Sequence, residues 1–172
     1  MTRPVAIILA FLIVAACQRH EPMAGGKPLS HWKKEATQVD WLSFWNSGKG
    51  DRRRTAFRHL SEIGEPAIPA LLDLAREHDG PVRSGALDVL AKMGPRAASA
   101  VPELIEMLND GPTGLRLRVA WVLGAIGPPA ESAVPSLTPL LQHPDQKLRQ
   151  AAAKALAQIG GSGHGPVEGS RS

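Results

Sequence analysis

The chain has 172 residues, of which 43% are hydrophobic, 21% are charged and only 4% are aromatic, and its formal net charge is +4. This length favours a single domain, and the ordinary apolar share excludes a wholly disordered chain. The single cysteine excludes an internal disulfide and leaves no cysteine pair for a zinc site, and the small positive excess does not by itself indicate nucleic-acid binding.

The N-terminus has the pattern of an export signal. Arg3 is the only charged residue among the first sixteen, and an apolar run of twelve residues follows from Val5 to Ala16. As a helix this run would rise about 18 Å, which is short of the roughly 30 Å hydrocarbon core of a membrane. A basic start, a short apolar run and small residues at its end are typical of a secretory signal peptide, so residues 1–16 are predicted to be removed.

The end of this run, from Val14 to Cys17, resembles the lipobox of bacterial lipoproteins, in which an aliphatic residue and two small residues precede a cysteine. The resemblance implies that Cys17 is lipidated and becomes the first mature residue, and more than one acyl chain there would anchor it stably. The alternative is an ordinary signal peptide with a chance cysteine at the cleavage site. Gln18 stands where an aspartate commonly retains such proteins in the inner membrane of Gram-negative bacteria. The expected location is therefore the bacterial cell envelope, with the outer membrane favoured and the domain facing the periplasm or the exterior.

Two segments separate this signal from the main pattern. Residues 17–27 are predicted to form a short lipidated tether, and residues 28–50 a capping segment whose helix Ser30 can cap. Trp41 and Trp45 lie at the end of this segment. They are expected either to cover the first helical unit or to serve as an aromatic anchor for a partner.

Four glycines divide residues 51–160 into repeating units. A leucine lies four positions before each glycine, an alanine or valine eight before, and an arginine eleven before. The glycines are Gly64, Gly94, Gly127 and Gly160, with spacings of 30, 33 and 33 residues. The apolar positions recur at the spacing of one helix face, and the glycine is predicted to end that helix in a left-handed conformation.

A second helix is predicted after each of the first three glycines. Pro102 and Pro135 lie eight residues past their glycines, where a proline is tolerated in the first helical turn. Pro69 lies only five residues past Gly64, which accounts for the shorter first spacing. Pro139 should kink the second helix of the third unit or shorten it at its N-terminal end.

The recurring arginines are predicted to lie at the start of each first helix and to bridge to the preceding outer turn. Aspartates in those turns are the expected acceptors in partly exposed pairs. The arginines are Arg53, Arg83, Arg116 and Arg149, and the aspartates are Asp79, Asp110 and Asp145.

This pattern over residues 51–160 resembles the HEAT-repeat family, in particular the short repeats of about 30 residues found in phycobilisome lyases and many bacterial proteins. The resemblance implies an all-α fold, an α-solenoid of about three and a half helical hairpins with an N-terminal capping helix. The fourth unit has no second helix, and residues 161–172 are expected to form a disordered tail.

We find no catalytic motif, and we expect no metal and no cofactor. HEAT-like proteins include a di-iron hydroxylase that uses His-Glu pairs on successive repeats, but the only adjacent pair here is His20-Glu21, which lies in the tether. The leading hypothesis is a non-catalytic, membrane-anchored scaffold that binds a protein or peptide. The alternatives are a HEAT-like lyase or enzyme accessory subunit, and a purely architectural envelope protein.

The resemblance implies that the second helices line the concave face of the stack. Five acidic residues align there and form either a solvated helix face or a docking strip for a basic segment. They are Asp73, Glu77, Glu103, Glu106 and Asp110, which we call the acidic strip. Trp121 lies within the first helix of the third unit and is expected to pack inside the stack.

Overall fold

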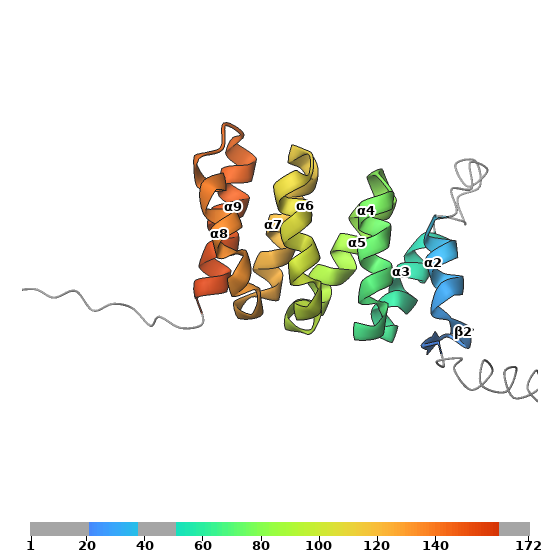
Figure 1. Ribbon diagram of the computed structural model, residues 1–172. Coiled ribbons are helices and arrows are strands. Elements are labelled where there is room, and N and C mark those ends of the chain that lie inside the picture. The colour runs from blue at the N-terminus through green and yellow to red at the C-terminus, as the bar shows by residue number, and fades with distance from the viewer. Residues whose placement is uncertain (1–20, 38–50, 162–172) are drawn as a thin grey trace, which may run out of the picture.

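The computed structural model of the chain describes residues 21–37 and 51–161. The predicted signal peptide, Cys17, the adjacent His20, Trp41, Trp45 and the tail beyond Gly161 lie outside the described residues. Within the described part, helices follow one another in a single row of stacked pairs (Figure 1). The predicted all-α solenoid with an N-terminal capping helix is confirmed.

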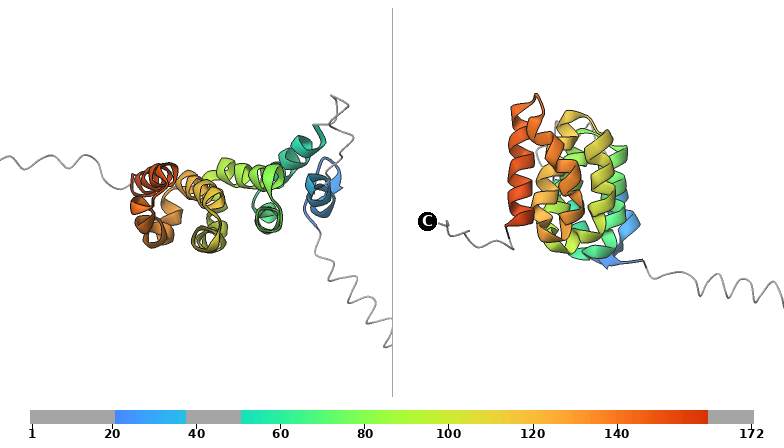
Figure 2. Two further views of the ribbon diagram at one scale, coloured as in Figure 1. Left: turned by 90° about the horizontal axis from the view of Figure 1, so that it is seen from above. Right: turned by 60° about the vertical axis from the view of Figure 1, so that its left-hand side comes forward.

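The helices alternate between two layers. The first-helix layer holds the first helix of each repeat unit, and the second-helix layer holds the capping helix and the second helices. The first layer consists of α3 (Asp51–Ile63), α5 (Gly80–Met93), α7 (Thr113–Ile126) and α9 (Gln146–Gly160). The second consists of α2 (Leu29–Thr37), α4 (Ile68–Glu77), α6 (Val101–Asp110) and α8 (Val134–Leu137). Figure 2 shows both layers from above.

The first helices pack directly against one another, most extensively α7 against α9, whereas neighbouring second helices touch only slightly. Because the first helices approach more closely, the stack curves toward their layer (Figure 2). The expectation that the second helices line the concave face is therefore wrong for the described helices.

Short 3₁₀ segments join the first helix of a unit to the second. They are η2 (Glu65–Ala67), η3 (Gly94–Ala100) and η4 (Pro128–Ala133). In the third unit the second helix breaks after four residues and continues as η5 (Thr138–Gln142), which contains Pro139. A proline there cannot donate the backbone hydrogen bond that would continue the α-helix. The α-helix begins at Val134 and stops before Pro139, so it is shortened at its C-terminal end, and the prediction of a shortening at its N-terminal end is wrong.

The repeat glycines end three of the four first helices. Gly64, Gly94 and Gly127 have φ values of 75°, 56° and 74° and ψ values of −138°, −131° and −141°. These angles are close to the mirror image of extended backbone, which glycine alone adopts readily, and not to the left-handed helical conformation that was predicted. Gly160 lies inside α9 and has no positive φ. The prediction is wrong there because no second helix follows in the described structure, so the chain makes no sharp turn at this glycine.

The units share one apolar core that extends from Ala24 to Ile159. The leucines four positions before the first three glycines, Leu60, Leu90 and Leu123, are fully buried. Leu156, at the same position of the last unit, is only partly buried because no further unit covers α9 in the described structure. No polar or charged residue is buried among the described residues.

Three of the four recurring arginines connect their unit to the one before it, chiefly through backbone carbonyls, whereas the buried Nε of Arg53 has no hydrogen-bond partner among the described residues. Arg83 Nε donates to the Ala75 carbonyl at 2.9 Å, and Arg116 Nε donates to the Leu108 carbonyl at 2.7 Å. Arg149 donates to two carbonyls of the turn before α9, each at 2.8 Å. These carbonyls lie at or just past the ends of second helices, where the intrahelical donors have run out, so the guanidinium caps the preceding unit.

Of the three aspartates predicted to pair with the recurring arginines, only one does so in the described structure. Asp79 forms an ion pair with Arg83, as expected. Asp145 instead caps α9 by accepting the backbone N–H groups of Lys147 and Leu148. Asp110 has no ion pair with a described residue. Backbone carbonyls are better placed than carboxylates on exposed turns, because they are fixed by the helix that carries them.

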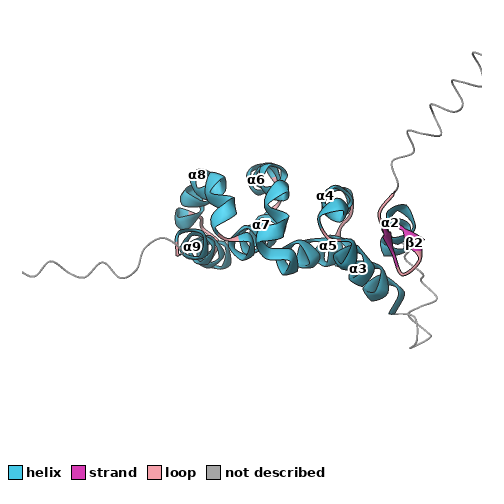
Figure 3. Cartoon of the chain, turned by 90° about the horizontal axis from the view of Figure 1, so that it is seen from below, coloured by secondary structure: helices cyan, strands magenta, loops and turns pink. Residues whose placement is uncertain are grey.

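A short hairpin precedes the capping helix, although no strand was predicted. Strand β1 (Met23–Ala24) pairs antiparallel with β2 (Lys27–Pro28), as Figure 3 shows at the N-terminal end of the stack. Trp32 Nε1 donates to the Ala24 carbonyl at 2.9 Å, and the Trp32 ring stacks on His59 with centroids 4.1 Å apart. The hairpin and α2 thereby cover the exposed side of α3.

The start of α2 also differs from the prediction. Ser30 lies inside the first turn, and its N–H and hydroxyl donate to the Glu21 carboxylate. Glu21 therefore takes the capping role expected of Ser30. The described part of the predicted tether, residues 21–27, packs against the domain through these contacts and those of the hairpin.

Candidate docking groove

One column of residues on the first helices faces away from the core. The residues four and eight positions before each repeat glycine are largely buried. The residue six positions before the glycine lies two positions from each of them, about 200° around the helix, and therefore on roughly the opposite side. The residues six positions before the glycines are Arg58, Asp88, Trp121 and Lys154. This column, unlike the core columns, changes chemistry from unit to unit.

Three hollows lie along this column. The first, of about 620 Å³, lies between α3 and α5. The second lies between α5 and α7 and the third between α7 and α9, each of about 350 Å³. The first two share Asp88, and the last two share Leu117 and Trp121, so the hollows form one continuous surface. We call this surface the first-helix groove; it runs from Arg54 and Lys92 through Asp88 and Trp121 to Lys154.

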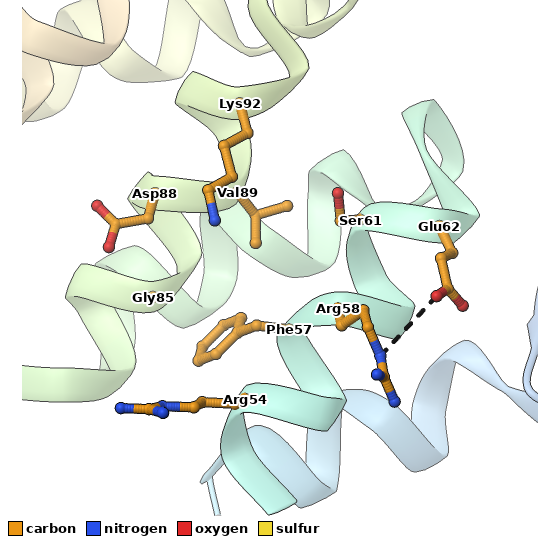
Figure 4. Close-up of a pocket in the computed structure, with 9 residues that line it drawn as sticks. All are labelled: Arg54, Phe57, Arg58, Ser61, Glu62, Gly85, Asp88, Val89 and Lys92. Carbon is orange, nitrogen blue, oxygen red and sulfur yellow. Dashed lines mark ion pairs between the residues drawn. The ribbon is translucent and has the colours of Figure 1, made fainter. Parts of the chain in front are cut away.

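Figure 4 shows the hollow between α3 and α5. The Phe57 ring extends from α3 across Gly85 of α5, and the Lys92 side chain points into the space above it. A Cβ atom at Gly85 would overlap the Phe57 ring, so glycine is required for this close approach. Arg58 turns toward Glu62, with Nε and Oε1 4.0 Å apart. The floor of this hollow is thus apolar and its rim is charged.

Trp121 lies between the second and the third hollow of the groove. Its residue surface is 41% exposed, which makes it one of the few large apolar residues exposed in the described structure. The expectation that it packs inside the stack is therefore wrong. The close packing of α7 on α9 is fixed at Gly124, where a Cβ would overlap Gln158 and lie 3.0 Å from the Ala155 Cα. Trp121 stands beside this contact and lines the hollows on both of its sides.

The groove is predominantly basic. Its two acidic residues both have partners on the same face: Asp88 pairs with Arg118 at 2.9 Å, and Glu62 pairs with Arg58 and accepts a 2.7 Å contact from His59 Nδ1. The basic residues that line it are Arg54, Arg58, Lys92, Arg118, Lys147 and Lys154. Positive charge therefore exceeds negative charge over the groove as a whole, with the excess in its first and third hollows, whereas Asp88 and Arg118 balance each other in the middle one.

The acidic strip lies on the second-helix layer, with Asp73 and Glu77 on α4 and the other three residues on α6. Cations lie beside three of these five residues. Lys33 Nζ lies 2.7 Å from Asp73 Oδ2, and Arg76 lies 3.7 Å from Glu103 and 3.0 Å from Glu106.

Comparison with known families decides what the repeat is. A family model of HEAT repeats matches two overlapping segments, residues 41–115 and 101–167. The chain belongs to the HEAT-repeat family. No curated protein matches the chain.

A solved structure agrees with this fold. The HEAT stack resembles a designed armadillo repeat protein in complex with the peptide (KR)4, with a TM-score of 0.50 and 18% sequence identity. The match covers 77% of this chain and 64% of the designed protein, so this chain spans somewhat less than two thirds of its neighbour's length. At this identity the likeness establishes the solenoid fold.

Within residues 21–37 and 51–161, no group of three or more His, Cys, Asp and Glu side chains is placed to hold a metal ion. His59 and Glu62 form the contact given above, without a third ligand beside them. None of the helices in the described part is both long and apolar enough to cross a bilayer.

Sequence reasoning missed the first-helix groove for an identifiable reason. The repeat alignment directed attention to the positions that stay the same, which are core positions. The residues six positions before the glycines differ from unit to unit, and this variation could have located the groove. Core positions must stay apolar, whereas positions on the outer face can vary to suit a binding partner.

Proposed function

We propose that this HEAT-repeat protein is a non-catalytic scaffold that binds a protein or peptide partner at a bacterial envelope membrane. The observation that carries the proposal is the first-helix groove: a continuous surface over four stacked helices, with an exposed tryptophan and apolar floors. Buried apolar anchors surrounded by polar rims are what protein-binding surfaces typically provide, and tryptophan is enriched among the residues that dominate binding energy.

The likeness to a designed repeat protein bound to a peptide supports a partner of the same general kind. In a solenoid each unit contacts only its neighbours, so the outer faces of successive units add up to one extended surface. An extended surface of this kind suits an extended segment of another protein better than a small molecule. The acidic strip stays a second candidate surface, and Trp41 and Trp45 a third.

The membrane part of the proposal rests on the sequence. Residues 1–16 would direct export, and Cys17 after cleavage would carry the lipid, with the outer membrane favoured by Gln18. The HEAT units would then be held close to the membrane by the few residues between Cys17 and Glu21, since residues 21–37 pack on the domain. The lyase or accessory-subunit alternative predicts stoichiometric iron or zinc in the purified protein, which the scaffold does not.

Proximity labelling in the native organism tests the scaffold directly. The wild-type protein, Trp121→Ala and Asp73→Lys combined with Glu106→Lys would each be fused to the same labelling enzyme. We expect a small set of neighbours to lose labelling in Trp121→Ala while the bulk envelope proteins keep theirs. Loss confined to the Asp73/Glu106 variant would move the docking site to the acidic strip. A labelled set that is unchanged in both variants would reject binding through either surface.

A further inference from the structure

We infer that the first-helix groove receives an extended acidic segment of a partner protein, anchored by one bulky apolar side chain beside Trp121. This inference rests on the proposed scaffold function and specifies the chemistry of its partner.

The anchor site is the hollow between α7 and α9. Leu117, Trp121, Ala151 and Ala155 give it an apolar lining, and the exposed face of Trp121 forms one wall. The flanking lysines and glutamines contribute side-chain methylenes below their polar ends. A space of about 350 Å³ with this lining favours one aromatic or large aliphatic side chain over a charged one.

The charge of the partner follows from which cations are available. Asp88 and Glu62 are already engaged by Arg118 and Arg58. Arg54, Lys92, Lys147 and Lys154 line the hollows and have no ion pair with a described residue. Carboxylates on a partner would therefore meet unpaired positive groups at both ends of the groove, whereas a basic segment would meet mainly like charge.

The spacing of the units sets the form of the partner. Packed helices lie about 8–10 Å apart, and an extended chain rises about 3.3 Å per residue, so each unit accommodates about three residues of a segment that crosses the helices. The anchor hollow and the hollow beside Lys92 are two units apart. A segment with an apolar residue followed by a short run of acidic residues would fill the first and reach the second.

The test uses the full-length chain in a nonionic detergent and a fluorescein-labelled peptide in which one phenylalanine precedes alternating glutamate and aspartate. Fluorescence anisotropy gives its affinity. Two further peptides carry serine in place of phenylalanine, or lysine and arginine in place of the acids. We expect the first peptide to bind most tightly, with an affinity that falls as salt is added.

Variants locate the site. Trp121→Ala should weaken binding of the first peptide by about tenfold or more, and Lys154→Glu by about threefold or more, while Lys34→Glu, an exposed charge reversal on α2, should leave it unchanged. Circular dichroism and the urea midpoint show whether each variant is folded. Equal binding of the serine peptide, tighter binding of the basic peptide, or equal weakening by Lys34→Glu would overturn the inference.

Vesicles that contain phosphatidylglycerol provide the competing source of negative charge. If Lys154→Glu weakens vesicle binding and the acidic peptide does not bind, the groove contacts lipid and the inference is wrong. The proposed scaffold function is tested separately by proximity labelling. Labelling that depends on Trp121 would support the groove as a docking site even if the acidic peptide does not bind.

Discussion

At the scale of single residues, glycines decide how closely the helices of this protein approach and how sharply the chain turns. Gly85 and Gly124 permit close contacts between first helices, and Gly127 turns the chain with φ 74° and ψ −141°. A Cβ at Gly127 would meet only one atom, the Gln158 carbonyl oxygen at 3.9 Å, which is an ordinary contact. Substitution there therefore measures backbone conformation and not crowding.

We predict that Gly127→Ala lowers the free energy of unfolding by about 1–3 kcal/mol, because alanine is strained at these backbone angles. Urea unfolding monitored by circular dichroism measures this. Gly114→Ala is the matched control: Gly114 lies within α7 without a positive φ, and its Cβ would meet open space, so this substitution should be neutral or stabilise by up to about 1 kcal/mol. Equal effects of the two substitutions would contradict the strained turn.

The sequence contained enough information to place these turns but not their angles. A glycine after a repeated aliphatic residue predicts a helix end, and both left-handed and mirror-extended backbone would satisfy that pattern. Likewise, Trp121 follows core residues closely enough in α7 to be mistaken for one. Trp121 lies two positions from both Val119 and Leu123, and two positions are about 200° around a helix, so its side chain points outward while theirs point into the core.

At the scale of the helices, the units are joined by apolar contact and by one arginine in each junction. Arg116 donates from Nε to the Leu108 carbonyl at 2.7 Å and from a terminal nitrogen to the Asn109 carbonyl at 3.2 Å. Both carbonyls lie in the last turn of α6, so Arg116 fastens the end of one unit to the start of the next.

Arg116→Ala is expected to destabilise the protein by about 1–3 kcal/mol, since two carbonyls lose a charged donor in a partly buried place. Arg96→Ala serves as its counterpart. Arg96 is 65% exposed and lies 3.9 Å from Glu65, so its loss should change stability by no more than about 0.5 kcal/mol. Thermal and urea unfolding of the two variants should be compared; similar losses would mean that the capping bonds add nothing beyond ordinary surface charge.

The helices of the repeat could be predicted because their apolar positions recur at helical spacing four times over. The hairpin from Met23 to Pro28 could not, because it has only two residues in each strand and its stability comes from Trp32 and His59, which are distant in the pattern. The curvature of the stack could not be predicted either, because it depends on how closely the helices pack. Small residues such as Gly124 permit close packing, but they do not change the spacing of the apolar residues in the sequence.

At the scale of the whole molecule, the two layers carry different charge. The first-helix groove is basic, and the acidic strip lies on the other layer, where Lys33 and Arg76 neutralise part of it. A stack fixed near a membrane surface would present these layers in different directions. The predicted lipid on Cys17 therefore bears on which layer a partner can reach.

We predict that Cys17→Ser abolishes lipidation and leaves the signal uncleaved, because the resemblance to lipoproteins makes this cysteine both the lipid carrier and the cleavage site. Membrane fractionation, detergent extraction and intact-mass measurement check this. Wild-type protein should require detergent for release and should carry the added mass of acyl chains at Cys17, and the variant should lack that mass. Release of the wild-type protein by salt alone would contradict the lipid anchor.

The position of Trp121 has a consequence for how this surface can diversify. Because the indole lines two adjacent hollows, a single codon change there alters the shape of both at once, while the hollow at Phe57 has no wall from this residue. Exchanging α7 for the corresponding helix of a related HEAT-repeat protein would therefore change the partner side chains that both of these hollows accept. Under the proposed function, selectivity would therefore change in overlapping pairs of neighbouring hollows and not one unit at a time.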